Sequence, residues 1–238
     1  MARFDRHRWT ALAGLAALGL YGAFLGDRLY ARDLRVALDR GRRLYWQVRR
    51  TEHVHEPFEL VDQLMRRTED TRTVIEALAL EPGEVVADVG CGSGYFTFDL
   101  AQQVGRAGTV WSLDIQEESL AFLQLRLDSR LCPDCGKVEL LHSRVDDAML
   151  APASVDAMLM VNLDFYAFEP LLPESARMLA SCLRALRPGG RLVVVQDLCP
   201  IPGGSPGALE RNLAAAGFAL EHGEDLTANS VLRRFRKP

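Results

Sequence analysis

Five short apolar runs, separated by helix-like stretches, constrain the fold of this chain more than any other feature. Each run is almost continuously hydrophobic, which is typical of parallel strands that helices cover on both faces. The predicted strands cover residues 85–89, 109–114, 137–142, 155–161 and 191–197, and the predicted helices cover residues 73–80, 95–104, 117–129, 170–186 and 207–216. This alternation predicts an α/β fold with a doubly wound, mostly parallel sheet.

A glycine-rich loop follows the first predicted strand in the stretch VVADVGCGSGYF. Its glycines, Gly90, Gly92 and Gly94, have the spacing GxGxG, whereas the dinucleotide fingerprint GxGxxG needs a glycine where Tyr95 stands. Asp88 lies two residues before the first glycine. A carboxylate there would repel a pyrophosphate and attract an ammonium or sulfonium group. The loop therefore predicts a positively charged ligand.

Four more motifs follow in order, and the set resembles the class I S-adenosylmethionine-dependent methyltransferases. The motifs are VWSLDIQ, SRVDDAML, VDAMLMVN and LRPGGRLVVVQD. The resemblance covers roughly residues 70–220, and it implies a seven-stranded Rossmann-like sheet that binds S-adenosylmethionine. Such a sheet ends in an antiparallel strand pair, and the last ten residues, NSVLRRFRKP, are a charged and poor match to one.

The resemblance also implies cofactor contacts for particular residues. Asp88 would face the methionyl ammonium group, and Asp114 would accept from both ribose hydroxyls. Asp146 would accept from the adenine amino group while Val145 offers its backbone amide, and the carbonyl of Asn162 would meet the methionyl ammonium. Taken singly, each of the three acids could instead be a turn cap, a helix cap or a solvated loop residue.

The methyl acceptor is not specified by these motifs. In similar enzymes the segment after the fourth strand, here NLDFYAFEP, faces the acceptor, so Asp164 and Tyr166 are the candidates for contacting it. Methyl transfer needs alignment more than acid–base chemistry, so the family has no universal catalytic residue. The catalytic residues stay unassigned, and the expected acceptor is a small or lipid-like molecule.

Two other functions compete with an active methyltransferase. A non-catalytic, membrane-tethered module could retain the fold as a binding domain, and the poor match at the C-terminus favours this alternative. A dinucleotide-dependent oxidoreductase is the third interpretation, and Tyr95 and Asp88 argue against it.

The N-terminus predicts a membrane anchor. Residues 9–25 contain no charged residue and are just long enough to span a bilayer, and the larger arginine excess lies on their C-terminal side. We expect a single-pass anchor over 1–26 with a cytoplasmic catalytic domain over 71–238, joined by a basic amphipathic helix and lid or linker over 27–70. A cleaved signal peptide and a buried soluble helix remain alternatives.

The charge distribution separates the N-terminus from the rest of the chain. Residues 1–50 hold 11 arginines and 4 aspartates, a net charge of +7, whereas the rest of the chain carries −11. An acidic body argues against nucleic acid as a partner, and a basic N-terminus suits an anionic membrane surface.

The cysteines and histidines predict neither a metal site nor a disulfide framework. The five cysteines are odd in number and mostly far apart, which favours a reducing compartment. Cys132 and Cys135 form a CxxC without the second pair that a zinc site needs, so we interpret them as a surface turn and, less readily, as a redox pair. His53, His55 and Glu56 are a weak metal candidate. We therefore expect reduced cysteines and no bound metal.

Overall fold

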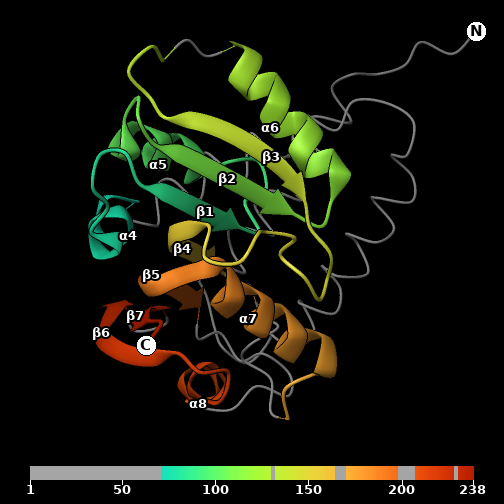
Figure 1. The fold of residues 1–238 in the computed structure, drawn as a ribbon, viewed down its shortest axis with the longest axis vertical. Coiled ribbons are helices and arrows are strands. Elements are labelled where there is room, and N and C mark those ends of the chain that lie inside the picture. Colours follow the sequence, from blue (N-terminus) through green and yellow to red (C-terminus); the bar gives the residue numbers. More distant parts are fainter. Residues whose placement is uncertain (1–70, 130–131, 164–169, 198–206, 228–229) are drawn as a thin grey trace, which may run out of the picture. The chain divides into compact units, whose positions relative to one another are not determined.

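The computed structural model describes residues 71–129, 132–163, 170–197, 207–227 and 230–238 (Figure 1). The described strands form one seven-stranded sheet in the order β3-β2-β1-β4-β5-β7-β6. This confirms the predicted mostly parallel Rossmann-like sheet. The predicted segments 1–26 and 27–70 lie outside the described residues, and none of the described helices is long and apolar enough to cross a membrane.

The elements alternate as the apolar runs predict. The strands are β1 Val85–Val89, β2 Thr109–Asp114, β3 Lys137–His142, β4 Val155–Val161, β5 Leu186–Asp197, β6 Ala219–Thr227 and β7 Ser230–Arg236. The helices are α4 Thr71–Leu78, α5 Thr97–Val104, α6 Glu117–Ser129, α7 Pro173–Ala185 and α8 Ala208–Ala215.

The order of the strands places a topological switch beside β1. The chain runs outward from β1 to β2 and β3, then returns to β4 on the other side of β1, and all of these pairings are parallel. Parallel strands end at the same edge of the sheet, and the crevice outside their carboxyl ends at a switch point is where ligands bind in open α/β sheets. The loops after β1, β2 and β4 therefore meet at one place.

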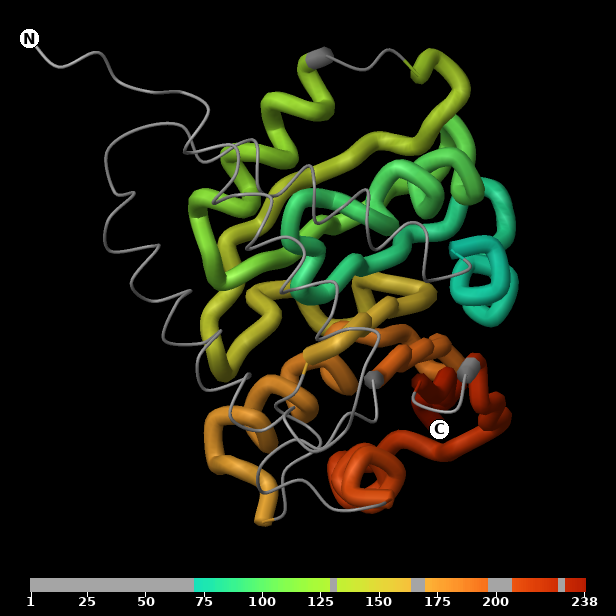
Figure 2. The backbone as a smooth tube through the Cα atoms, turned by 180° about the vertical axis from the view of Figure 1, so that it is seen from behind, coloured from blue at the N-terminus to red at the C-terminus, as the bar shows by residue number. Residues whose placement is uncertain are grey.

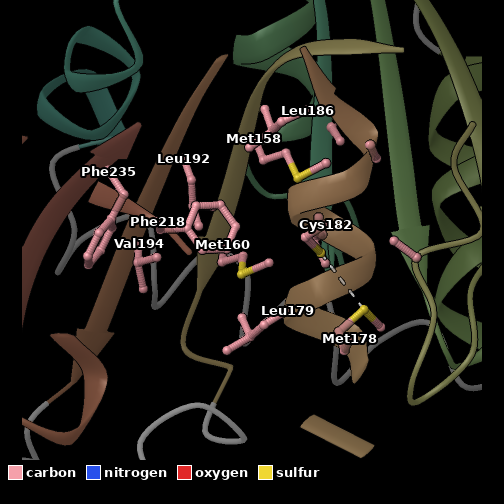
Figure 3. Close-up of a cluster of buried hydrophobic side chains, with 14 of the residues drawn as sticks. Met158, Met160, Met178, Leu179, Cys182, Leu186, Leu192, Val194, Phe218 and Phe235 are labelled. Carbon is pink, nitrogen blue, oxygen red and sulfur yellow. Dashed lines mark hydrogen bonds between the residues drawn. The ribbon is translucent and has the colours of Figure 1, made fainter. Parts of the chain in front are cut away.

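The two faces of the sheet bury alternate residues of the same strands. Leu159 and Val193 pack with α4 and α5 on one face, and Met158 and Val194 pack with α7 and α8 on the other. Figure 3 shows the second cluster, in which the thiol of Cys182 lies 3.9 Å from the sulfur of Met178. Burial on both faces explains why these strands are uninterrupted apolar runs.

The C-terminal residues form a better strand pair than their sequence suggests. β7 pairs antiparallel with both β5 and β6, and Figures 1 and 2 show this end of the sheet from opposite sides. Val231, Leu232 and Phe235 are buried, while Arg233 pairs with Glu210 at 2.7 Å. The charged residues thus have partners on neighbouring elements, and our expectation of a poor match is wrong.

The turn between α6 and β3 also differs from expectation. Cys132 and Cys135 form a disulfide, with their Cα atoms 5.4 Å apart, so our expectation of reduced cysteines is wrong for this pair. The turn brings the two residues together, because the amide of Cys135 donates to the carbonyl of Cys132 at 3.2 Å. Cys91 and Cys182 are free, as expected, and both are buried.

Candidate functional site

The glycine loop after β1 is held by the end of β2. The amides of Gly90 and Cys91 both donate to the carbonyl of Leu113, at 2.8 and 2.9 Å, and the amide of Gly94 donates back to the carbonyl of Cys91. All three glycines have positive φ, a conformation that residues with a Cβ adopt at a cost. This explains why the loop needs glycine at every second position.

The three glycines differ in what surrounds them. A Cβ at Gly90 would lie 2.5 Å from a methyl carbon of Leu163, and one at Gly94 would lie 2.3 Å from a methyl carbon of Leu123. At Gly92 a Cβ would meet no atom of the described chain within 4 Å. Gly90 and Gly94 therefore allow close packing within the protein, whereas Gly92 borders open space that a ligand could fill.

Asp88, the last residue but one of β1, is a buried carboxyl group close to the start of this loop. It accepts a hydrogen bond from the hydroxyl of Thr97 at 2.7 Å, and Thr97 in turn shares one with Ser112 at 3.2 Å. Burial raises the pKa of Asp88 to about 7; the hydrogen bond from Thr97 lowers it, and the nearby charge of Asp114 raises it further. A buried carboxyl group of this kind gains from a cationic ligand, which favours its charged form.

Asp114 ends the neighbouring strand and points to the same loop. Its two carboxylate oxygens accept from the amides of Gly92 and Gln116, each at 2.9 Å. A carboxylate has about four lone-pair sites, so both oxygens keep acceptor capacity for a ligand. The backbone bonds fix the carboxylate beside Gly92, the one glycine that borders open space.

The loop after β4 closes the other side of this crevice. Asn162 has a positive φ of 53°, and its amide donates to the carbonyl of Val195 at 2.8 Å. The next residue, Leu163, packs against Gly90 as described above. The structure thus brings Asp88, Asp114 and Asn162 to the carboxyl ends of three adjacent strands.

Two neighbouring acids in the loop after β3 have different partners. Asp147 accepts from the hydroxyl of Ser181 at 2.6 Å and from Arg184 at 3.2 Å, and the Ser181 bond is the main reason why its pKa is lowered. Asp147 therefore ties the loop to α7. Asp146 instead pairs with Arg177 at 3.0 Å, a contact that the sequence did not predict.

The remaining predicted residues have different outcomes. The side chain of Val145 is 61% exposed, which leaves it accessible to a ligand. Asp164 and Tyr166 lie outside the described residues, as do His53 and His55. Among the residues that the structure describes, no three histidines, cysteines or acids are grouped so that they could hold a metal ion.

Profiles of two protein families match this chain. The family described as "Methyltransferase domain" matches residues 86–190, and "Protein-L-isoaspartate(D-aspartate) O-methyltransferase (PCMT)" matches residues 38–131. Both matches contain the glycine loop and Asp114.

Curated relatives also match this chain. An arsenite methyltransferase of Halobacterium salinarum is 31% identical over 129 residues, which are 52% of this chain and 30% of that protein. A demethylmenaquinone methyltransferase of Lysinibacillus sphaericus is 26% identical over 165 residues, which are 65% of this chain and 66% of that protein. The chain thus spans less than two thirds of the length of both relatives.

Solved structures share the fold. A SAM dependent methyltransferase from Aquifex aeolicus has a TM-score of 0.61 at 21% identity, covering 71% of this chain and 90% of its own. A geranyl diphosphate methyltransferase in complex with SAM has a TM-score of 0.57 at 16% identity, covering 71% and 84%. Together the family profiles, the curated relatives and the shared fold support a class I S-adenosylmethionine-dependent methyltransferase.

The geometry of this methyltransferase domain fits the cofactor that gives the family its name. S-adenosylmethionine carries a sulfonium and an ammonium group, and Asp88 supplies a buried carboxyl group at the crevice. It also carries a ribose, for which Asp114 offers two fixed oxygens. The open side of Gly92 leaves room next to Asp114, whose carboxylate binds the Gly92 amide. The observed arrangement therefore agrees with a cationic ligand that contains a sugar.

Sequence reasoning missed three residues at this methyltransferase site. Thr97 donates to Asp88 and shares a hydrogen bond with Ser112, and the only signal for these two residues is a hydroxyl in each of two apolar stretches, YFTF and VWSLD. Ile115 follows Asp114 directly, and its side chain is 53% exposed. This exposed apolar side chain lies beside the predicted ribose contact, and the only signal for it was its position just after the strand.

Proposed function

We propose that the protein transfers a methyl group from S-adenosylmethionine to a small or lipid-like acceptor. The observation that carries this proposal is the pair of fixed acids at adjacent strand ends, Asp88 and Asp114, with Asp114 bound to Gly92, which borders open space. When bound, the cofactor supplies an activated methyl group. The protein's own task is to hold donor and acceptor in line, because proximity and alignment lower the barrier of such a displacement.

Each residue of the crevice has a defined part in this proposal. Asp88 balances the cationic end of the cofactor, and Asp114 accepts from its ribose hydroxyls. The backbone carbonyl of Asn162 receives the methionyl ammonium, and the amide of Val145 and the carboxylate of Asp146 receive the adenine. For the last role Asp146 has to share its carboxylate with Arg177 or release it.

A lipid-like acceptor is supported by the relatives and by the cysteines. Relatives of this chain act on demethylmenaquinone and on arsenite. Arsenite binds thiolates, but within the described residues Cys91 and Cys182 are buried with raised pKa values, and Cys132 and Cys135 are joined. These thiols do not suit a thiophilic acceptor, which favours an organic, apolar one. The candidates for contacting it remain Asp164 and Tyr166.

We also propose that residues 9–25 anchor the protein in a membrane, with the methyltransferase domain on the cytoplasmic side. The support is the uncharged run itself and the arginine excess that follows it. A membrane anchor and a lipid-like acceptor support each other, because tethering raises the local concentration of molecules confined to the same surface.

Calorimetry and a transfer assay test the proposal. The purified protein should bind S-adenosylmethionine and S-adenosylhomocysteine but not NAD. It should also transfer radiolabelled methyl groups to a component of a membrane lipid extract. Binding of NAD without either adenosyl compound would refute the cofactor assignment. Cofactor binding without transfer to lipid or small-molecule extracts would favour the non-catalytic module instead.

A further inference from the structure

One side chain outside the crevice contacts the glycine loop directly. Arg126 of α6 donates from its terminal nitrogen to the carbonyl of Ser93 at 2.6 Å, across 33 residues of sequence. Its guanidinium carbon also lies 4.9 Å from the centre of the Phe98 ring on α5. Stacking on the ring and donating in its own plane are both properties of a guanidinium group, so the two contacts fix its orientation together.

The peptide bond that receives this contact is held from both sides. Its carbonyl, from Ser93, accepts from Arg126, and its amide, from Gly94, donates to the carbonyl of Cys91 at 2.9 Å. This peptide joins Ser93 to Gly94, one residue after Gly92, whose amide binds Asp114. Rotation of the peptide would therefore alter the loop where it borders the predicted ribose site.

α6 approaches the loop through one face. Leu123 packs so closely against Gly94 that a Cβ there would lie 2.3 Å from it, and Arg126 stands three residues later, on the same side of the helix. Leu123 is fully buried in a small cluster with Cys91 and Phe98. The loop thus rests on α6 at an apolar contact and a charge-assisted one.

We propose that Arg126 is a positioning residue for the cofactor, which sets the conformation of the glycine loop by holding the Ser93 carbonyl. This inference rests on the proposed function of the crevice. Arg126 acts on the loop and not on the ligand, because a positive charge would repel the sulfonium group. That distinction can be tested, since S-adenosylhomocysteine lacks the sulfonium charge of S-adenosylmethionine.

The test compares Arg126→Met, Arg126→Lys and Arg233→Met in the full-length protein. Arg126→Met should weaken binding of both adenosyl compounds by the same factor, roughly tenfold, the scale for a hydrogen bond to a charged group. Arg126→Lys should restore part of this loss, because lysine can donate but cannot stack in the same plane. Arg233→Met is the matched control, because Arg233 lies on β7, three strands away from β1, and the change removes its ion pair with Glu210 of α8.

Two outcomes would overturn the inference. The first is that Arg126→Met binds the cofactor with wild-type affinity. It also counts as the first outcome if Arg126→Met loses no more affinity than Arg233→Met when the two variants have lost the same amount of melting temperature. The second is an affinity for S-adenosylmethionine that rises relative to the affinity for S-adenosylhomocysteine in Arg126→Met, which would show that the charge of Arg126 acts on the ligand.

Hydrogen exchange of the Gly94 amide without ligand separates this inference from the proposed function. Faster exchange in Arg126→Met than in Arg233→Met supports the positioning role even if the wild type binds no cofactor. Equal exchange in the two variants refutes the role even if the wild type binds.

Discussion

At the scale of single residues, the most informative group is the carboxyl of Asp88. Its pKa is raised from 3.8 to about 7, first by burial and then by the charge of Asp114, against the hydrogen bond from Thr97. The native protein therefore holds a proton at pH values where the unfolded chain has lost it. The contribution of Asp88 to the free energy of unfolding should therefore fall as the pH rises from 3.8 to about 7, and it should stay constant above about pH 7.

The same titration predicts how cofactor affinity depends on pH. Because a cationic ligand favours the carboxylate, affinity for S-adenosylmethionine should rise with pH up to about 7, and binding should release protons below it. Calorimetry in two buffers of different ionisation enthalpy measures this release. Thr97→Val should move the midpoint to higher pH, since it removes the contact that lowers the pKa. A pH profile identical in Asp88→Asn and wild type would contradict the assignment.

Asp114 should matter for the ligand through its two oxygens. Asp114→Ala removes the acceptor of two backbone amides as well as the predicted ribose contact, so cofactor binding should weaken by roughly 1.5–3 kcal/mol. Asp128→Ala is a control, because Asp128 is exposed on α6 and accepts from Gln124 within the same helix. Equal affinities in the two variants, measured by calorimetry, would count against Asp114 as a ligand contact.

At the scale of elements, the glycine loop should separate stability from binding. Gly92→Ala and Gly94→Ala both place a Cβ at positive φ, which costs roughly 1–2 kcal/mol of stability. Gly94→Ala should lose more, because its Cβ also collides with Leu123, whereas Gly92→Ala should mainly lose cofactor affinity. Gly189→Ala is the matched control, with φ +75° and only the end of Arg236 nearby. Thermal melts measure the stability of the three variants, and calorimetry measures their cofactor affinity. Equal losses of affinity in Gly92→Ala and Gly189→Ala would refute a role of Gly92 in cofactor binding.

The disulfide turn between α6 and β3 should stabilise the fold only slightly. It closes a ring of four residues, for which chain entropy gives about 1–2 kcal/mol. The turn has other attachments, since Arg106 donates to the carbonyl of Pro133 at 2.6 Å. Dithiothreitol should therefore lower the melting temperature by a few degrees without unfolding the protein, and a Cys132→Ser, Cys135→Ser variant should not respond. Two further thiols that react with a labelling reagent before reduction would contradict the disulfide.

The elements differ in how far the sequence predicts them. β1 to β4 have the predicted bounds, because strands buried on both faces are continuous apolar runs. β5 begins at Leu186, five residues before the predicted start, because the chain pairs with Val155 ahead of an irregularity in the register. β7 was underestimated because its arginines are paired with residues such as Glu210, which come near only when the chain folds.

At the scale of the whole molecule, the site also combines residues that local sequence predicts with residues whose contacts form only when distant segments pack together. Asp88, the glycines and Asp114 were predicted because they stand together in two short motifs at strand ends. Thr97, Ser112 and Arg126 were missed because their contacts arise where two helices and a neighbouring strand pack around the loop. The complete strand pair at the C-terminus also removes the one sequence observation that favoured a non-catalytic module.

The membrane anchor that we propose is a prediction for the whole chain. The uncharged residues 9–25, between arginine-rich flanks, should keep the protein in the membrane pellet after carbonate washing. Leu15→Asp combined with Leu18→Asp should release it, because each acid at the centre of the run opposes insertion by about 2.5–3.5 kcal/mol. The matched change Leu15→Ile with Leu18→Ile should leave it in the pellet.

Protease should digest the methyltransferase domain only from the cytoplasmic side, where the arginine excess should hold it. A soluble wild-type chain, a mature N-terminus near residue 27, or protection from protease on the cytoplasmic side would each contradict the anchor. A released double variant that still binds S-adenosylmethionine but methylates membrane lipids more slowly would show that the anchor serves encounter with the acceptor and not the chemistry itself.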